Sequence, residues 1–266
     1  MSASGVRAFV DEARRVGFTV RDHAHPESAG PLAVSGMLAE QLAKELSAGA
    51  EPASVIAAGA EAAGRAEVLV RIVAGDPTAG DEELVRLADA RGVPVVMVQL
   101  WPQADWTRPF VLTPFVVECR AGEGFPVREI ADRIVEATER DASLAVRIPV
   151  LADASRAGAV RSTVVRSALI GFAGSRYPAA RPLLALEQVR LLSGLRNLSG
   201  MAGDDDFRLR AAGAGAVLAS SFAFRGIARS LRTFLPAPIA NAAVAAAGTW
   251  ALAKVLEVAE AKLPEA

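Results

Sequence analysis

The chain is poor in several residue types, and each shortage excludes a class of protein. It has one cysteine, Cys119, so no disulfide can form within the chain, and we expect a reducing, intracellular compartment. His23 and His25 are the only histidines, and no cysteine joins them to complete a zinc site, so we interpret them as part of a loop. Asp11 and Glu12 precede any apolar run, so we expect no secretory signal peptide.

Aromatic residues are also scarce, at 5% of the 266 positions, although hydrophobic residues make up 52% and charged residues 22%. A packed core is therefore available, and global disorder is not expected. Much of the apolar content is alanine, which buries little area per residue. The helices that contain it must pack by close approach rather than by bulky side chains.

Motifs for several chemistries are missing. The sequence contains no GxxxxGK[ST] phosphate loop and no GxSxG, HExxH or CxxC pattern. We therefore predict that the protein is not an enzyme and has no cofactor. The net charge is −1, and the arginines lack interleaved exposed aromatics, which argues against nucleic-acid binding.

The net charge conceals a difference between two parts of the chain. Residues 1–140 hold 14 Lys and Arg against 21 Asp and Glu, a net charge of −7, whereas residues 141–266 hold 15 against 9, a net charge of +6. A shift of this size favours a domain boundary near residue 140. We predict a domain over 1–140 and a second over 141–266.

The middle of the chain predicts an open α/β sheet. A β-branched run at 67–75 and apolar runs at 93–100 and 115–119 are typical of buried parallel strands, and helical patterns cover 81–92 and 126–140. We expect Asp81 to cap the first of these helices, with Gly92 ending it and Pro126 in the first turn of the second.

Secondary structure is less clear elsewhere. Before residue 60 we expect helices over 4–16 and 34–47, a short strand over 17–22 and a loop over 23–33. After residue 140 strand patterns fade, and we expect helices at 154–173, 179–200, 205–232 and 238–262. The predicted fold class is a small parallel-sheet α/β domain followed by an all-α bundle or hairpin domain.

Residues 50–140 resemble the second half of a Ras-like or Era-like GTPase domain. The strand at 93–100 leads into WPQAD where that family has its guanine-reading NKxD motif, and Glu118-Cys119-Arg120 stands in place of Ser-Ala-Lys. The order of strands and helices matches that family, but its functional residues are absent. No nucleotide contact is therefore implied for this chain. Cys119 is either a buried strand cysteine, which we favour, or a thiol whose pKa Arg120 lowers.

Residues 155–260 resemble a bacterial helical domain family of unknown function that occurs beside or fused to GTPase domains and in inner-membrane proteins. The supporting segments are 168–178, 183–195, 225–236 and 242–257. The family's recurring positions are matched by Gln188, Gly226, Ala228, Arg229, Pro236, Gly248 and Thr249. Pro178-Ala-Ala-Arg181 departs from the family's Pro-Gly-Ala-Asp-like turn. The resemblance implies association with GTPase regulation or membranes.

An arginine stripe is the candidate contact surface. Arg225, Arg229 and Arg232 follow one another at i, i+4 and i+7, so they share one face of a predicted helix. Such a face can lie on an anionic membrane, bind an acidic protein partner or simply be solvated, and the sequence leaves all three open.

The segment 233–253 is uncharged over 21 positions, which is long enough to cross a membrane. Pro236 and Pro238 interrupt its start, and alanine contributes little to insertion. We therefore favour a soluble or peripheral helical hairpin over true insertion.

These patterns together predict a non-catalytic regulatory or scaffold protein. We expect it to be cytoplasmic and membrane-proximal, and to act with a GTPase or another protein partner, with homo-oligomers as a further option. Two alternatives stay open: a GTPase-like protein that binds nucleotide through non-standard contacts, and a helical component inserted in the membrane.

Overall fold

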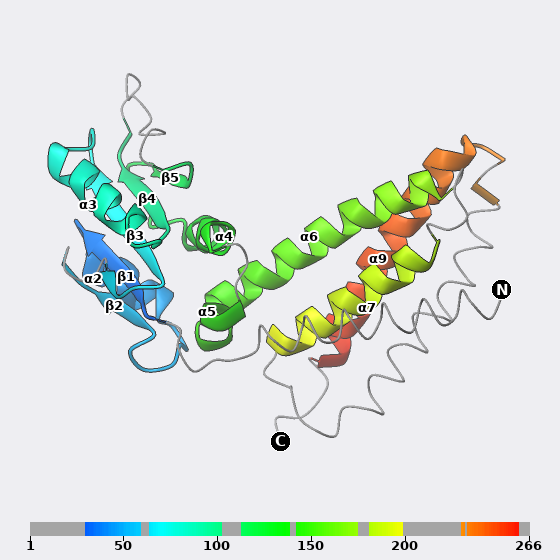
Figure 1. Ribbon diagram of the computed structural model, residues 1–266, viewed down its shortest axis with the longest axis horizontal. Helices are drawn as coiled ribbons and strands as arrows, with labels where there is room; N and C mark the ends of the chain where they lie inside the picture. Colours follow the sequence, from blue (N-terminus) through cyan, green and yellow to red (C-terminus); the bar gives the residue numbers. More distant parts are fainter. Residues whose placement is uncertain are drawn as a thin grey trace. The chain divides into compact units, whose positions relative to one another are not determined.

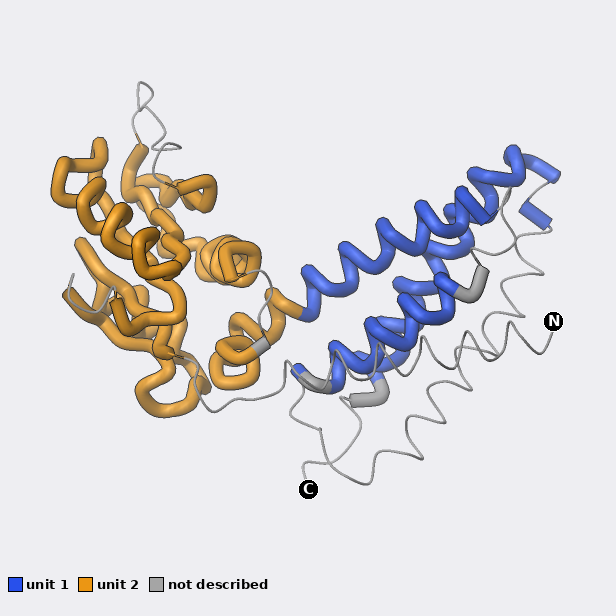
Figure 2. The backbone as a smooth tube through the Cα atoms, viewed as in Figure 1, with its two compact units in different colours: residues 1–22, 156–266 blue, residues 23–155 orange. Residues whose placement is uncertain are grey.

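The chain folds into two compact units. The computed structural model describes residues 30–59, 64–102, 113–138, 142–174, 181–198 and 230–260 except 232. One unit, the sheet unit, comprises residues 23–155, and the other, the helical unit, has its described residues between 156 and 260 (Figures 1 and 2). The predicted α/β region followed by helices is confirmed.

The sheet unit is built on five parallel strands in the order β2-β1-β3-β4-β5. Their bounds are β1 Leu32–Gly36, β2 Val55–Ala57, β3 Val68–Ala74, β4 Val95–Leu100 and β5 Val116–Cys119. Every residue of β4 is buried, which confirms that the continuous apolar run 93–100 supplies a strand covered on both faces.

Helices cover both faces of this sheet. They are α2 Ala39–Leu46, α3 Ala79–Asp89 and α4 Val127–Ala137. Leu84, Val85 and Ala88 of α3 pack on one face with Leu69 and Met97. The helices α2 and α4 contact each other and the strands, and cover the other face (Figure 1). Burying each large aliphatic side chain in such a core contributes ~1.5–3 kcal/mol.

The start of α3 corrects the prediction that Asp81 is its cap. Thr78 is the N-cap: its side chain accepts a hydrogen bond from the Asp81 N–H, and the Asp81 carboxylate accepts one from the Thr78 N–H. This reciprocal capping box places Asp81 three residues inside the helix. Gly92 has φ +70° and follows the helix, as predicted for its end.

The predicted loop over 23–33 and helix over 34–47 are wrong where they meet, because a strand lies there. Leu32–Gly36 is β1, which pairs with both β2 and β3, and the helix α2 is confined to Ala39–Leu46. The strand is hidden in the sequence because it holds Ala33, Ser35 and Gly36, none of which favours a strand. Pairing on both sides overrides these weak local preferences. The short strand β2 was also not predicted.

A further helix that was not predicted, α5 Ala142–Arg147, belongs to the sheet unit. Ser143 Oγ donates a hydrogen bond to Glu67 Oε1 at 2.6 Å, and Arg147 donates one to the Gly30 carbonyl at 2.7 Å. Leu144 and Ile148 are buried. These contacts explain why the two units divide between residues 155 and 156, inside the next helix, whereas the charge shift lies near residue 140.

The helical unit contains three described long helices, α6 Pro149–Ala173, α7 Arg181–Leu198 and α9 Ala237–Glu260. They lie side by side in Figures 1 and 2. Leu191 and Leu195 of α7 pack with Ala253 of α9 and with Ala159 and Val160 of α6. The helices predicted at 154–173, 179–200 and 238–262 are thus confirmed, with α6 starting five residues earlier. The helix predicted at 205–232 lies almost wholly outside the described residues.

Candidate functional site

The carboxyl edge of the sheet is the first candidate site. From β1 the chain passes to β2 on one side and then to β3 on the other, so the strand order reverses between β1 and β3. In open α/β sheets ligands bind outside the carboxyl ends of the strands at such a point. The backbone there is left-handed at Gly36 (φ 103°) and Gly75 (φ 77°), directly after or at the ends of β1 and β3.

Two bulky residues at this edge are also left-handed. Leu38 follows β1 with φ 58°, and Trp101 follows β4 with φ 53°. Such a conformation costs a large non-glycine residue ~1–3 kcal/mol and concentrates at functional sites. Their side chains are 45% and 50% exposed, and Met37 is 50% exposed. The edge therefore presents apolar side chains to solvent, which suits contact with a partner.

Two polar side chains beneath this edge have unsatisfied oxygens. Ser35 is 1% exposed and Gln99 is fully buried. Gln99 Nε2 donates to the Gly75 carbonyl at 3.0 Å, which fixes the amide, while Gln99 Oε1 and Ser35 Oγ have no hydrogen-bond partner. A buried acceptor without a partner is costly, so these two oxygens are exceptions within the core of the sheet unit.

An ion pair joins the same face of the sheet to α3. Arg71 of β3 donates from Nε to Asp81 Oδ1 at 2.8 Å and lies 2.7 Å from it through a second nitrogen. Burial by itself would raise the pKa of Asp81, but hydrogen bonds from Thr78 and Arg71 hold that pKa below its usual value. Asp81 is thus an anchor for α3, and its negative charge is already matched.

The connection after β1 does not resemble a phosphate-binding loop. Only Met37 and Leu38 separate β1 from α2, and neither offers a lysine or hydroxyl for a nucleotide. A Cβ on Gly36 would lie 2.1 Å from the Ile72 carbonyl oxygen, so glycine is required there by the neighbouring strand. This glycine serves sheet packing rather than a phosphate cradle.

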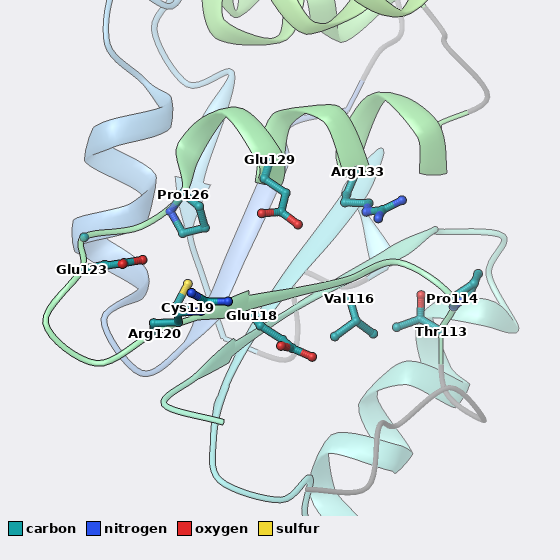
Figure 3. A pocket seen from close by; sticks show the side chains of 11 residues that line it. Thr113, Pro114, Val116, Glu118, Cys119, Arg120, Glu123, Pro126, Glu129 and Arg133 are labelled. Carbon is teal, nitrogen blue, oxygen red and sulfur yellow. The ribbon is translucent and has the colours of Figure 1, made fainter. Parts of the chain in front are cut away.

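A hollow of about 480 Å³ lies beside β5. Figure 3 shows Glu129 and Arg133 extending from α4 towards β5, with Val116 and Glu118 on the strand. The rest of the lining comprises Thr113, Pro114, Cys119, Arg120, Glu123, Gly124 and Pro126. Charges of both signs line it, so no single ionic ligand is favoured.

Cys119 in this hollow is buried, as the favoured interpretation predicted. Burial and the negative charge of Glu129 raise the pKa of its thiol to about 11. The alternative, a thiol with a pKa lowered by Arg120, is therefore wrong. Burial away from water disfavours the charged thiolate, and this is the larger of the two causes. Such a thiol is a poor nucleophile at neutral pH.

Among the described residues of the helical unit, a buried polar cluster has one member from each of α6, α7 and α9. Thr249 Oγ1 of α9 lies 2.9 Å from Ser167 Oγ of α6, and Gln188 Nε2 of α7 donates to Thr249 Oγ1 at 3.4 Å. All three side chains are buried. Gln188 and Thr249 are two of the positions on which the helical-family resemblance rests. Polar side chains satisfied in this way fix the register of the three helices.

The helix α9 is the second candidate site. Among the described residues it is the one helix long and apolar enough to cross a membrane, by length and composition, over Ala237–Val258. Only 33% of its most apolar window is buried. Large apolar side chains are exposed along and just before it: Phe234, Ile239, Trp250, Val255 and Val258. The sequence analysis found the uncharged run but not which side chains it exposes.

Other residues named in the sequence analysis lie outside the described residues. These include the arginine stripe of Arg225, Arg229 and Arg232, the histidines His23 and His25, and the predicted helix over 4–16 and strand over 17–22. The stripe therefore stays a prediction. The carboxyl-edge oxygens of Ser35 and Gln99 were missed, because polar residues inside strands give no recognisable motif.

Comparison of the chain with known protein families, with curated proteins and with solved structures finds no match.

Proposed function

We propose that this chain is a non-catalytic regulatory or scaffold protein that works at a membrane. In this proposal the helical unit attaches the chain to the lipid, and the sheet unit binds a protein partner. The observation that carries the proposal is α9, which has no ionisable side chain from Ala237 to Ala253 and yet is only 33% buried in its most apolar window.

The physical argument rests on how apolar helices are stabilised. A helix that is apolar on all sides is covered either by protein or by lipid. The described neighbours α6 and α7 cover one side of α9, where Ala240, Val244, Ala245 and Ala253 are buried. Ile239 and Trp250 remain 50% and 54% exposed. Lipid contact removes this apolar surface from water.

Charge patterning adds support from the sequence. The arginine stripe (Arg225, Arg229 and Arg232) precedes α9 directly along the chain. Arginines near an anionic leaflet contribute ~1 kcal/mol each to attachment. An apolar helix with basic residues beside it is a common arrangement for binding a membrane surface.

The sheet unit supplies the recognition part of the proposal. Met37, Leu38 and Trp101 expose apolar surface at its carboxyl edge, and loops that a rigid sheet holds in place commonly carry binding residues. A GTPase is the partner that the family resemblances imply. A GTPase partner is thus a proposal that rests on those resemblances.

Vesicle flotation tests the attachment. The wild-type chain should float with vesicles of mixed neutral and anionic lipid, and I239Q/W250Q should bind roughly a hundredfold more weakly, since two large apolar side chains contribute ~3 kcal/mol. The matched control M37Q/L87Q removes two exposed apolar side chains from the sheet unit and should float like the wild type. Failure of the wild-type chain to float would end the proposal.

A further inference from the structure

We propose that α9 lies in the plane of the membrane surface, with one face in the lipid, rather than crossing the bilayer. This inference rests on the proposed attachment and specifies its geometry. The lipid-facing surface, here called the α9 outer face, consists of Ile239, Ala243, Ala247 and Trp250. The occupant of this face is the boundary between phospholipid headgroups and acyl chains.

The first step is that α9 is joined to its neighbours along its length. Near its start, a Cβ on Gly171 of α6 would lie 2.7 Å from the Asn241 carbonyl oxygen, so the two backbones are in close contact. In the middle, Thr249 contacts Ser167 and Gln188. Towards its end, Ala253 packs with the leucines of α7. The contacts between α9 and the bundle therefore extend over most of the apolar segment.

The second step is that α6 and α7 cannot enter the hydrocarbon. Arg166 of α6 and Glu187 of α7 form an ion pair at 3.2 Å, one residue away from Ser167 and Gln188 in each helix. The two helices also carry Arg161, Arg190 and Arg196. Ionised side chains are strongly disfavoured in the core of a bilayer. A transmembrane α9 would either take these charges into the lipid or break its contacts with both helices.

The third step is the arrangement of the α9 outer face. Its members follow one another at i, i+4, i+8 and i+11, so they fall within an arc of about 80°. All four are exposed. Lys254 and Glu257, an exposed ion pair, follow on the same side near the end of the helix. An apolar face that ends in charged residues suits the interface, where ionised side chains reach the headgroups and tryptophan is favoured.

Lipid is favoured over a protein partner by the length of the uncharged segment. No ionisable side chain occurs from Thr233 to Ala253, and Phe234, at its start, is 85% exposed. Protein interfaces of ordinary size carry a polar rim and direct hydrogen bonds. The α9 outer face offers no hydrogen-bonding side chain except the indole N–H of Trp250.

Trp250 is also the probe that tests the geometry. The chain has three tryptophans, so W101F/W106F leaves Trp250 as the sole tryptophan. Its fluorescence is measured in anionic vesicles whose lipids carry bromine either near the headgroup, at acyl carbons 6 and 7, or deep, at carbons 11 and 12. An in-plane helix lies ~5–10 Å into the headgroup and acyl boundary. Shallow bromines should therefore quench Trp250 at least twofold more than deep ones.

The opposite order would overturn the inference. In a helix that spans from Ala237, Trp250 lies 13 residues in, or about 20 Å, near the middle of a ~30 Å core. Deep bromines would then quench it more strongly. Absence of quenching by either lipid, with no flotation, would instead show that the proposed attachment itself fails and that another protein or a second copy covers the face. If W101F/W106F unfolds early, the difference in emission between the wild type and W250F gives the same readout.

Discussion

A single carboxylate, Asp81, holds the first turn of α3 to the sheet. It is 4% exposed, accepts hydrogen bonds from Thr78 and pairs with Arg71 of β3. The sequence predicted that Asp81 lies at the start of this helix, but its partner Arg71 lies ten residues earlier and comes close only when the strand and the helix pack. The ion pair could therefore not be predicted from the sequence, although the position of the acidic residue could.

Replacing Asp81 tests this arrangement. D81N should lower the free energy of unfolding at pH 7 by ~2–4 kcal/mol, because it leaves Arg71 without its countercharge in a largely buried site. E82Q, which removes an exposed i,i+4 partner of Arg86, should change it by less than ~0.5 kcal/mol. Denaturant melts of both variants measure the difference. Equal free energies of unfolding for D81N and E82Q would show that the Asp81 carboxylate does not anchor α3.

The loss of stability in D81N should depend on pH in a defined direction. The pKa of Asp81 is lower in the folded state than in the unfolded chain. The stability that it contributes is therefore present above the unfolded pKa of about 3.9 and is lost as the pH falls through the folded pKa. The difference in free energy of unfolding between the wild type and D81N should thus become smaller in acid. A gap that widens below pH 4 would contradict the lowered pKa.

At the scale of elements, close packing of α6 against α9 depends on Gly171. A Cβ there would lie 2.8 Å from Ala245 Cβ and 2.7 Å from a backbone oxygen, so G171A must push the helices apart. We expect a net loss of ~1–3 kcal/mol despite the better helix propensity of alanine. G158A, on the same helix with nothing within 4 Å of the new Cβ, should gain up to ~1 kcal/mol. Thermal melts that rank the two variants in the opposite order would exclude close packing at Gly171.

The elements that sequence predicted well are those with a strong pattern. The strand at 95–100 is apolar except for Gln99, and α9 carries no charge from its start to Ala253; both were found within two residues at each end. The strand β1 was missed because Ala33, Ser35 and Gly36 have weak strand preference, and only pairing on both sides makes them a strand. The exposed side of α9 was also not predictable, since it depends on where α6 and α7 pack.

At the scale of the whole molecule, the sheet unit has the strand order of a ligand-binding fold without a phosphate loop. Met37 and Leu38 form the whole connection between β1 and α2. We therefore expect no binding of GTP or ATP with Mg²⁺ tighter than a dissociation constant of ~10 μM, or about −7 kcal/mol. Isothermal titration calorimetry of the full chain measures this. A tighter constant for either nucleotide would favour the alternative of non-standard nucleotide contacts.

The division into two units bears on how the molecule works. The charge shift near residue 140 predicted two domains, and contacts of α5 place residues up to 155 with the sheet. The sheet unit and the helical unit are thus distinct parts of the chain, joined within α6. In the proposed function only the helical unit touches lipid. Lipid attachment and partner binding should therefore respond to substitutions in different units.

Cell fractionation tests membrane attachment most directly. Membranes from cells that express the full chain are washed in high salt, which screens ionic attraction but not apolar contact. The wild-type protein should stay with the membranes after this wash and leave them in detergent, while I239Q/W250Q should move to the soluble fraction and M37Q/L87Q should not. A wild-type chain found wholly in the soluble fraction before any wash would contradict the account.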